Sequence, residues 1–149
     1  MNPKLPEAHA YLGLALSSAG DYEAARSAFR AELDLDPYNF TAILELGMLE
    51  KRYQRLSEAL SLFERALIIH PGDPAGVYQI ATIELASGKV EEARRRLEML
   101  VRASPQFLEA HATLATVYYR LKRKEDGDRE RAIVRDLTAD EQTKKAAGK

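Results

Sequence analysis

Large aliphatic residues recur along this chain at a step of 34 residues, and the residue that follows each of them is small. The large positions are Leu12, Leu46, Ile80 and Leu114, and the small ones are Gly13, Gly47, Ala81 and Ala115. A small residue lets two helices approach closely, while large neighbours fill the space around the contact. The pattern therefore predicts four copies of one structural unit.

A second set of positions indicates that each unit contains a second helix. Twelve residues after each small position comes another small residue, and four residues further on comes a bulky one. These positions hold Ala25, Ala59, Ala93 and Gly127, and then Phe29, Phe63 and Leu97. Apolar residues in both halves of a unit are spaced as on one face of a helix, and no strand pattern competes.

Prolines and glycines mark the ends of the predicted helices. Four pairs stand 34 residues apart, namely Asn2-Pro3, Asp36-Pro37, His70-Pro71 and Ser104-Pro105. Proline lacks an N–H and disfavours helix in the residue before it, so each pair ends a helix. Pro6 and Pro74 stand where a helix begins, and Gly20 and Gly88 can take the left-handed conformation that ends one. We predict helices at residues 6–19, 22–35, 40–54, 57–70, 74–87, 90–103, 107–121 and 124–137.

These positions resemble the tetratricopeptide repeat, a helix–turn–helix unit of 34 residues. The residues that carry the resemblance are Leu12-Gly13, Ala25, Phe29, Pro37, Leu46-Gly47, Ala59, Phe63, Ala66 and Pro71, and it covers about residues 6–137. The resemblance implies an all-α fold, a right-handed α-solenoid of four helix-turn-helix tetratricopeptide-like repeats. The chain departs from the family at Glu32, where Ala is preferred, and at Glu50 and Glu84, where Tyr is preferred.

The repeats are expected at residues 6–39, 40–73, 74–107 and 108–137, after a remnant of a preceding repeat or a leader at residues 1–5. Because Asn2-Pro3 matches the end of a repeat, we expect this chain to be the tail end of a longer protein. The alternative is a natural start of the protein that reads MNP.

The fourth repeat departs most from the family, since Gly127 and Arg131 replace Ala and a bulky apolar residue. The charged segment from Lys122 is therefore expected to cap the stack. The polar tail at residues 138–149 is expected to prolong the last helix and then fray.

Charge and composition narrow the possible functions. The chain has 22 Lys and Arg against 23 Asp and Glu, so we expect no general attraction to nucleic acid or to an anionic membrane. Without cysteine it has no disulfide framework, thiol nucleophile or zinc–thiolate site. Neither a signal peptide nor an apolar run of membrane-spanning length is found, so we expect a soluble chain, with the cytoplasm favoured. Its abundance of Ala and Arg suggests a bacterial protein.

The titratable residues do not form a pattern typical of an active site. His9 and His111 share a repeat position but lie three repeats apart, and zinc ligands must all lie about 2 Å from one ion. His70 stands at a turn and is interpreted as structural. Glu50 and Glu84 are either a carboxylate pair or partners of Arg and Lys, and the second interpretation is favoured. Because no phosphate-binding loop or nucleophile motif occurs either, we expect no enzyme, no metal and no cofactor.

Apolar residues also occupy the first helix of each unit on the face turned away from its core. In the first unit that core face is expected to hold Ala8, Leu12, Ala15, Leu16 and Ala19. The resemblance implies that the first helices line a concave groove, which receives a peptide or helix from another protein. The expected partner-binding residues are Ala10, Leu14, Leu44, Met48, Lys51, Arg52, Tyr78, Thr82, Leu85, Thr116, Tyr119 and Arg120.

Packing between adjacent repeats is the alternative role for the apolar members of this set. Both interpretations stay open for Leu14 and Leu44, whereas partner binding is favoured for Met48, Tyr78 and Tyr119 because Met adapts to different shapes and Tyr combines area with a polar tip.

The basic candidates allow two interpretations as well. Lys51, Arg52 and Arg120 either contact acidic groups of a ligand or are simply solvated, and solvation is favoured. A clamp for a C-terminal carboxylate is not supported, because the groove positions hold Ala, Leu and Met. The run Arg94-Arg95-Arg96 is interpreted as a helix surface that forms ordinary ion pairs with Glu91, Glu92 and Glu98.

Self-association is a further possibility, through apolar surface around Tyr11 and Tyr22. The chain would then be a structural spacer or an assembly module of a larger protein. We expect a monomer or a weak homodimer.

Overall fold

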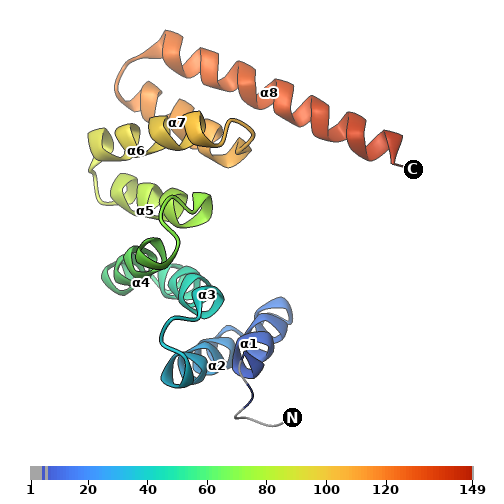
Figure 1. Cartoon of the computed structure of the whole chain (residues 1–149). Helices are drawn as coiled ribbons and strands as arrows, with labels where there is room; N and C mark the ends of the chain where they lie inside the picture. The colour runs from blue at the N-terminus through green and yellow to red at the C-terminus, as the bar shows by residue number, and fades with distance from the viewer. Residues whose placement is uncertain (1–4, 6, 149) are drawn as a thin grey trace. The chain divides into compact units, whose positions relative to one another are not determined.

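The computed structural model describes Leu5 and residues 7–148, which form eight α-helices and the turns between them, with no strand (Figure 1). The helices are α1 (Ala8–Ser18), α2 (Tyr22–Leu35), α3 (Phe40–Arg52), α4 (Leu56–Ile69), α5 (Pro74–Ala86), α6 (Val90–Ala103), α7 (Leu108–Arg120) and α8 (Lys124–Ala147). The predicted all-α class is confirmed, and each predicted helix is present. Asn2, Pro3 and Pro6 lie outside the described residues, as does most of the expected remnant at residues 1–5.

Helix α8 is longer than the helices before it and covers 24 residues. Its sequence after Leu137 contains Ala, Glu, Gln and Lys, which favour helix, and no glycine until Gly148. The segment from residue 138 therefore prolongs the last helix as far as Ala147, and every side chain from Ala139 to Gly148 is exposed.

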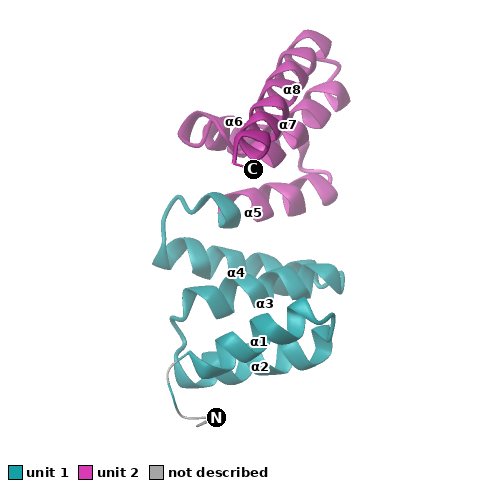
Figure 2. Ribbon diagram, turned by 90° about the vertical axis from the view of Figure 1, so that its right-hand side faces the viewer, with its two compact units in different colours: residues 1–76 teal, residues 77–149 magenta. Residues whose placement is uncertain are grey.

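The chain divides into two compact units, residues 1–76 and residues 77–149 (Figure 2). Unit 1 contains α1 to α4 and the start of α5, and unit 2 contains the rest of α5 with α6, α7 and α8. The division falls inside α5, three residues after the repeat boundary expected at 73. The four repeat boundaries stay a prediction.

Small residues of unit 1 lie directly against aromatic rings, as the repeat pattern predicts. A Cβ placed on Gly13 of α1 would lie 2.6 Å from Cε1 of Phe29 on α2. The same contact joins α3 and α4, where a Cβ on Gly47 would lie 2.7 Å from Phe63 Cε1. Both rings are fully buried, so neither has room to move away. These glycines are needed because the helices approach more closely than a side chain would allow.

The fourth helix pair makes this contact in the opposite sense. Here the glycine is Gly127 on the second helix, α8, and the ring is Tyr119 on the first helix, α7. A Cβ on Gly127 would lie 2.6 Å from Tyr119 Cε1. The departure of Gly127 from the repeat pattern is therefore a packing feature that lets α8 approach α7.

The core face expected for the first helix is wrong in part. Leu12 is 39% exposed, and Ala15 and Ala19 are exposed as well, whereas the buried residues of α1 are Ala8, Ala10 and Gly13. In α3 the equivalent residues Leu46 and Leu49 are buried in one cluster with Ala25 and Phe29 of the preceding helix α2. No described helix precedes α1, so the same repeat positions stay in contact with solvent there.

The Glu32 side chain fixes the start of α1. Its carboxylate is buried and accepts hydrogen bonds from the backbone N–H groups of Glu7, His9 and Ala10, at 3.0, 3.1 and 3.1 Å. The first N–H groups of a helix have no partner within the helix, and a negative charge is favourable at that end. Glu32 thus supplies an N-terminal cap from the neighbouring helix, which explains why this position holds Glu and not the Ala that the family prefers.

Candidate functional site

The partner-binding candidates of unit 1 differ in how much surface they offer. Ala10 is only 4% exposed, so the expectation that it presents surface to a partner is corrected. Leu14 packs against the core of unit 1, and Leu44 is half-buried. Met48 is 41% exposed and is the most accessible apolar candidate of this unit.

The basic candidates of unit 1 lie at the end of α3. Lys51 is half-buried, and this burial lowers the pKa of its ammonium group below the ordinary value. Arg52 is exposed, and its guanidinium lies over the ring of Tyr22, 4.1 Å from the ring centre. Arg52 is therefore not simply solvated, as the sequence favoured, because its guanidinium packs on an aromatic ring of the same chain.

The candidates on α5 make contacts within unit 2. The Tyr78 hydroxyl shares a hydrogen bond of 3.0 Å with Thr113 Oγ1, and its ring centre lies 5.2 Å from that of Phe107. Leu85 packs against the apolar core of the same unit, and the Thr82 hydroxyl donates to the Gln79 carbonyl. These contacts favour the alternative that Tyr78 and Leu85 pack α5 against the following repeat.

Two candidates on α7, Thr116 and Tyr119, line a hollow with residues of α8. Its volume is about 750 Å³, which is within the range of small ligand pockets. The lining residues are Ala112, Ala115, Thr116, Tyr119, Asp128, Arg131, Val134 and Arg135. We call this space the α7–α8 hollow. Arg120, the last candidate, is exposed at the end of α7.

The α8 side of this hollow was missed by the sequence interpretation. Asp128, Arg131 and Arg135 are spaced three and four residues apart, which places them on one face of a helix. That spacing is the signal that could have found them. The spacing alone does not say which face of α8 turns toward α7, because that depends on how the two helices pack.

Asp128 and Tyr119 form the polar rim of the hollow. Asp128 accepts hydrogen bonds from Lys124 Nζ at 2.6 Å and from the Tyr119 hydroxyl at 2.7 Å. These two donors hold the pKa of the Asp128 carboxyl below its usual range, and the bond to Asp128 raises the pKa of Tyr119. Asp128 is thus an ionised carboxylate whose charge is already engaged at neutral pH.

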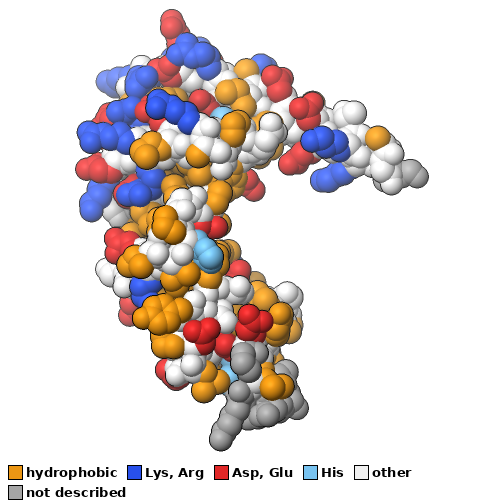
Figure 3. All heavy atoms as spheres, viewed as in Figure 1, with side chains coloured by type: hydrophobic (Ala, Val, Ile, Leu, Met, Phe, Trp, Pro, Cys, Tyr) orange, Lys and Arg blue, Asp and Glu red, His pale blue; other side chains and the backbone are white. Residues whose placement is uncertain are grey.

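A second hollow, of about 510 Å³, lies among α6, α7 and α8 and is rich in charged side chains. Arg94 pairs with Glu91 and Glu98 at 2.8 and 2.7 Å, and the Tyr118 hydroxyl donates to Glu98 at 2.7 Å. Figure 3 shows the Lys and Arg side chains that gather on this face of unit 2. The interpretation of the arginine run as forming ordinary ion pairs along its own helix is confirmed for Arg94. It is wrong in part for Arg96, which pairs with Glu84 of α5.

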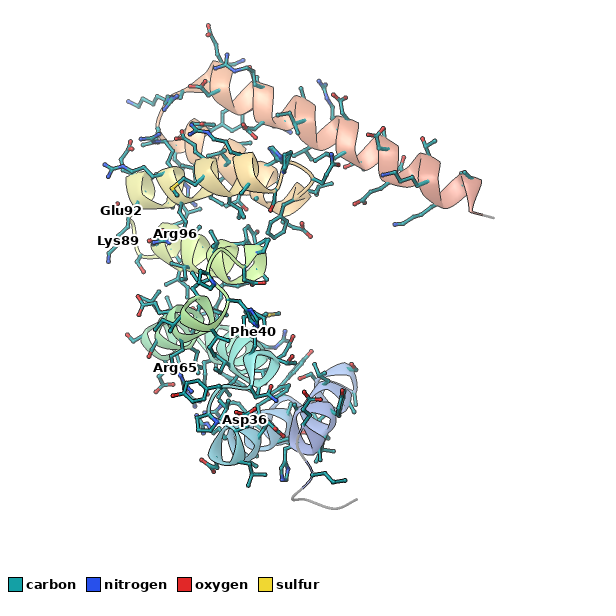
Figure 4. All side chains as sticks on the ribbon, viewed as in Figure 1. Asp36, Phe40, Arg65, Lys89, Glu92 and Arg96 are labelled. Atoms are coloured by element: carbon teal, nitrogen blue, oxygen red, sulfur yellow. The ribbon has the colours of Figure 1, made fainter. Side chains whose placement is uncertain are left out.

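The carboxylates weighed as an acid–base pair are both partners of arginine. Glu50 is 1% exposed and accepts from Arg26, Arg30 and Arg55 at 2.8, 2.8 and 3.1 Å. The bond to Glu50 raises the pKa of Arg26. In unit 2, Glu84 accepts from Nε and Nη2 of Arg96, which Figure 4 labels, at 3.0 and 2.7 Å. The favoured interpretation of both glutamates, as partners of basic residues, is confirmed.

The histidines have structural contacts. His111 is buried, with Nδ1 2.6 Å from Glu130 Oε2 and Nε2 2.9 Å from the Pro105 carbonyl oxygen, so its ring joins α7 to α8 and to the preceding turn. His70 meets the ring of Phe40, labelled in Figure 4, edge to face at 4.4 Å. Within the part of the chain that the structure describes, no three His, Cys, Asp or Glu side chains could hold a metal ion together. No described helix is long and apolar enough to cross a membrane.

Helix pairs that repeat along the chain and pack through small residues define an α-helical repeat protein. Family models of the tetratricopeptide repeat match residues 2–40, 11–74 and 52–117. The chain belongs to the tetratricopeptide repeat family.

Two curated relatives come from Arabidopsis thaliana. The Protein CTR9 homolog is 33% identical over 103 residues, which cover 68% of this chain and 9% of that protein. The TPR repeat-containing thioredoxin TTL4 is 34% identical over 87 residues, which cover 58% of this chain and 13% of that protein. The match thus spans only a small part of either relative.

Solved structures share the fold at lower sequence identity. MamA from Desulfovibrio magneticus RS-1 is 22% identical with a TM-score of 0.80, and the match covers 92% of this chain and 77% of that one. The pilF protein of Pseudomonas aeruginosa is 17% identical with a TM-score of 0.81, over 91% of this chain and 62% of that one. At these identities the likeness concerns the fold alone.

Proposed function

We propose that this chain is a protein–protein interaction scaffold that binds a peptide or helix of a partner protein on its first helices. Proteins of the tetratricopeptide repeat fold generally mediate protein–protein interaction, which supports the proposal. The observation that carries the proposal is the α7–α8 hollow, where two residues expected from the sequence, Thr116 and Tyr119, line one space. Leu14, Leu44, Met48, Lys51, Arg52 and Arg120 are proposed as further contacts.

The contacts of the titratable groups support a binding role without catalysis. Glu50 and Glu84 are held by arginines, and His111 is held by Glu130 and Pro105. A general acid or base must reach a substrate proton, and these groups face other protein atoms. We therefore propose that this chain has no enzymatic activity of its own. We also propose that it acts in the cytoplasm, which the sequence favours.

Affinity capture with a matched pair of variants tests this function. Thr116→Arg places a long side chain inside the hollow. Thr143→Arg makes the same change on α8 outside it. Both threonines are exposed and donate to the carbonyl four residues earlier, so the two changes cost the helix alike.

A binding scaffold would retain a protein from a source-like lysate on the wild-type chain and on Thr143→Arg, and lose it on Thr116→Arg. Circular dichroism would confirm equal helicity of the three chains. If no protein is retained, or if all three chains retain the same one, the α7–α8 hollow is not the binding surface.

A second candidate function is self-association through α1. This helix contains no Asp, Glu, Lys or Arg, and it leaves Tyr11 64% exposed beside the exposed Leu12. The residue equivalent to Leu12 in α3, Leu46, is buried against another helix. We propose that α1 of a second copy covers this face in a weak two-fold dimer, since an uncharged surface is complementary to itself. Tyr22 has a smaller part, because it already lies under Arg52.

Sedimentation velocity over a concentration series tests the dimer. Leu12→Glu should keep the chain monomeric at concentrations where the wild type sediments faster. Leu35→Glu, which replaces an exposed leucine of α2, should behave like the wild type. A wild-type chain that stays monomeric throughout the series contradicts the second candidate.

A further inference from the structure

The α7–α8 hollow has more positive than negative charge available to a ligand. Three charged residues line it, Asp128, Arg131 and Arg135. The Asp128 carboxylate is already engaged by Lys124 and Tyr119. Arg131 lies beside the Tyr119 hydroxyl and the Asp128 carboxylate, whereas Arg135 forms none of the ion pairs found among the described residues. The hollow therefore presents two guanidinium groups, one helical turn apart, and a single carboxylate that is already paired with Lys124 and Tyr119.

The rest of the lining is apolar or weakly polar. Ala112 and Ala115 of α7 face Val134 of α8 across the hollow, and Thr116 and the Tyr119 ring complete the wall. Ala112 and Thr116 are exposed, and Val134 is half-buried, so a ligand can reach them. An apolar side chain would remove this surface from water, while a charged group remains close to the arginines.

We propose that the α7–α8 hollow binds an acidic segment of a partner protein. A Glu or Asp carboxylate of that segment pairs with Arg131 and Arg135, and an adjacent Leu, Ile or Phe packs on Val134 and Ala112. Arginine matches the planar carboxylate with two donors, so the pair gives specificity as well as attraction. This inference rests on the proposed function and names the chemistry of the partner.

The single charge of a carboxylate suits this hollow better than the charge of a phosphorylated side chain. Asp128 lines the same space, and its carboxylate repels a phosphate group, which carries close to two negative charges, more strongly than it repels a carboxylate, which carries one. A basic segment is excluded by the two arginines, since like charges brought together in a partly buried site cost binding energy.

Selection from random peptides displayed on phage, with the full chain as bait, tests the proposal without a known partner. Enriched peptides should contain Asp or Glu next to a large apolar residue. The best peptide is then synthesised, and its affinity is measured by fluorescence anisotropy at low and high salt. Affinity should fall at high salt, because the ion pairs are screened.

Two double variants with the same charge change separate the site from general electrostatics. Arg131→Glu/Arg135→Glu reverses the charges in the hollow and should weaken binding about tenfold or more. Lys144→Glu/Lys145→Glu reverses two charges at the exposed end of the same helix and should leave the affinity within about twofold. A peptide in which every Asp and Glu is replaced by Lys should bind the first double variant better than it binds the wild type.

The outcomes distinguish this inference from the function on which it rests. Enriched peptides that lack acidic residues, yet lose binding with Thr116→Arg, would overturn the acidic segment and leave the scaffold function standing. Equal loss of affinity in both double variants would also overturn it. If a phosphorylated analogue of the selected peptide binds more tightly than the acidic one, the ligand chemistry is wrong. Selection that enriches no peptide contradicts both proposals.

Discussion

The ring of Tyr119 lies against the backbone of Gly127, so closely that a Cβ on the glycine would stand 2.6 Å from the ring. In unit 1 the same type of contact joins Gly13 to Phe29, with the glycine on the first helix of the pair and the ring on the second. In the fourth pair the ring stands on the first helix, α7, and the glycine on the second helix, α8. Tyr119 also lines the α7–α8 hollow, together with the two arginines of α8.

A double-mutant cycle tests how strongly the Tyr119 contact with Gly127 shapes unit 2. Alanine favours helix over glycine by about 1 kcal/mol, but the added methyl must displace the ring, which costs about 1–3 kcal/mol. Gly127→Ala should therefore destabilise the wild type, yet stabilise the Tyr119→Ala variant by about 1 kcal/mol. Urea unfolding of the four chains measures both changes. If Gly127→Ala stabilises the wild type and the Tyr119→Ala variant equally, the Tyr119 ring moves aside without cost, which would contradict this prediction.

Replacing Glu32 by the alanine that the family prefers should destabilise unit 1. The change leaves three backbone N–H groups at the start of α1 without their acceptor, at a cost of about 1–3 kcal/mol. Hydrogen exchange of the His9 and Ala10 amides should become faster before exchange elsewhere in the unit. Asp34→Ala, which removes an exposed carboxylate of the same helix, is the control. Unchanged amide protection in Glu32→Ala would show that the cap contributes nothing.

Neutralising Glu50 should cost more stability than neutralising an exposed glutamate. Glu50→Gln removes the buried charge that Arg26, Arg30 and Arg55 share, and it leaves Arg26 only the exposed Glu23 as an ionic partner. Breaking a buried ion pair typically costs about 3–5 kcal/mol. Glu64→Gln on the exposed side of α4 should change the free energy of unfolding by less than about 0.5 kcal/mol. Chemical denaturation of both variants checks the difference, and similar midpoints would contradict the role given to Glu50.

Stability should depend on pH through Tyr118. Burial and the hydrogen bond to Glu98 raise the pKa of Tyr118 to about 12, above the value of about 10 for an exposed tyrosine. Because the folded chain holds this proton more tightly, the contribution is complete below pH about 10 and is lost as the pH rises through about 12. The free energy of unfolding of the wild type relative to Tyr118→Phe should fall over this window. A constant difference between the two chains would contradict the assignment.

The sequence was sufficient to predict elements whose packing repeats along the chain. The contact of Gly13 with Phe29 occurs again at Gly47 and Phe63, so the same small and bulky residues recur 34 positions apart and can be recognised without a structure. Leu12 shows where this reasoning fails. Its repeat position is buried in α3, but burial is a property of the neighbouring helix and cannot be read from the residue itself.

The candidate site was only half predictable for a related reason. Thr116 and Tyr119 follow from the repeat positions, whereas Arg131 looked like a loss of the apolar pattern. Its place in the hollow depends on how α8 packs against α7, which the residue type alone does not reveal. Tyr78 shows the opposite case. The sequence favoured partner binding for this aromatic residue of the expected groove, whereas its ring packs on Phe107 and its hydroxyl is bonded to Thr113.

The most direct test of the account is to map the bound partner on the isotope-labelled chain. Once capture has identified a protein, its binding segment is titrated into the chain while backbone amide signals are followed by nuclear magnetic resonance. The largest shifts should fall on Ala112, Thr116, Val134 and Arg135, around the α7–α8 hollow. Shifts that leave these residues unchanged and gather on the charged face around Arg94 and Arg129 would contradict the proposed site.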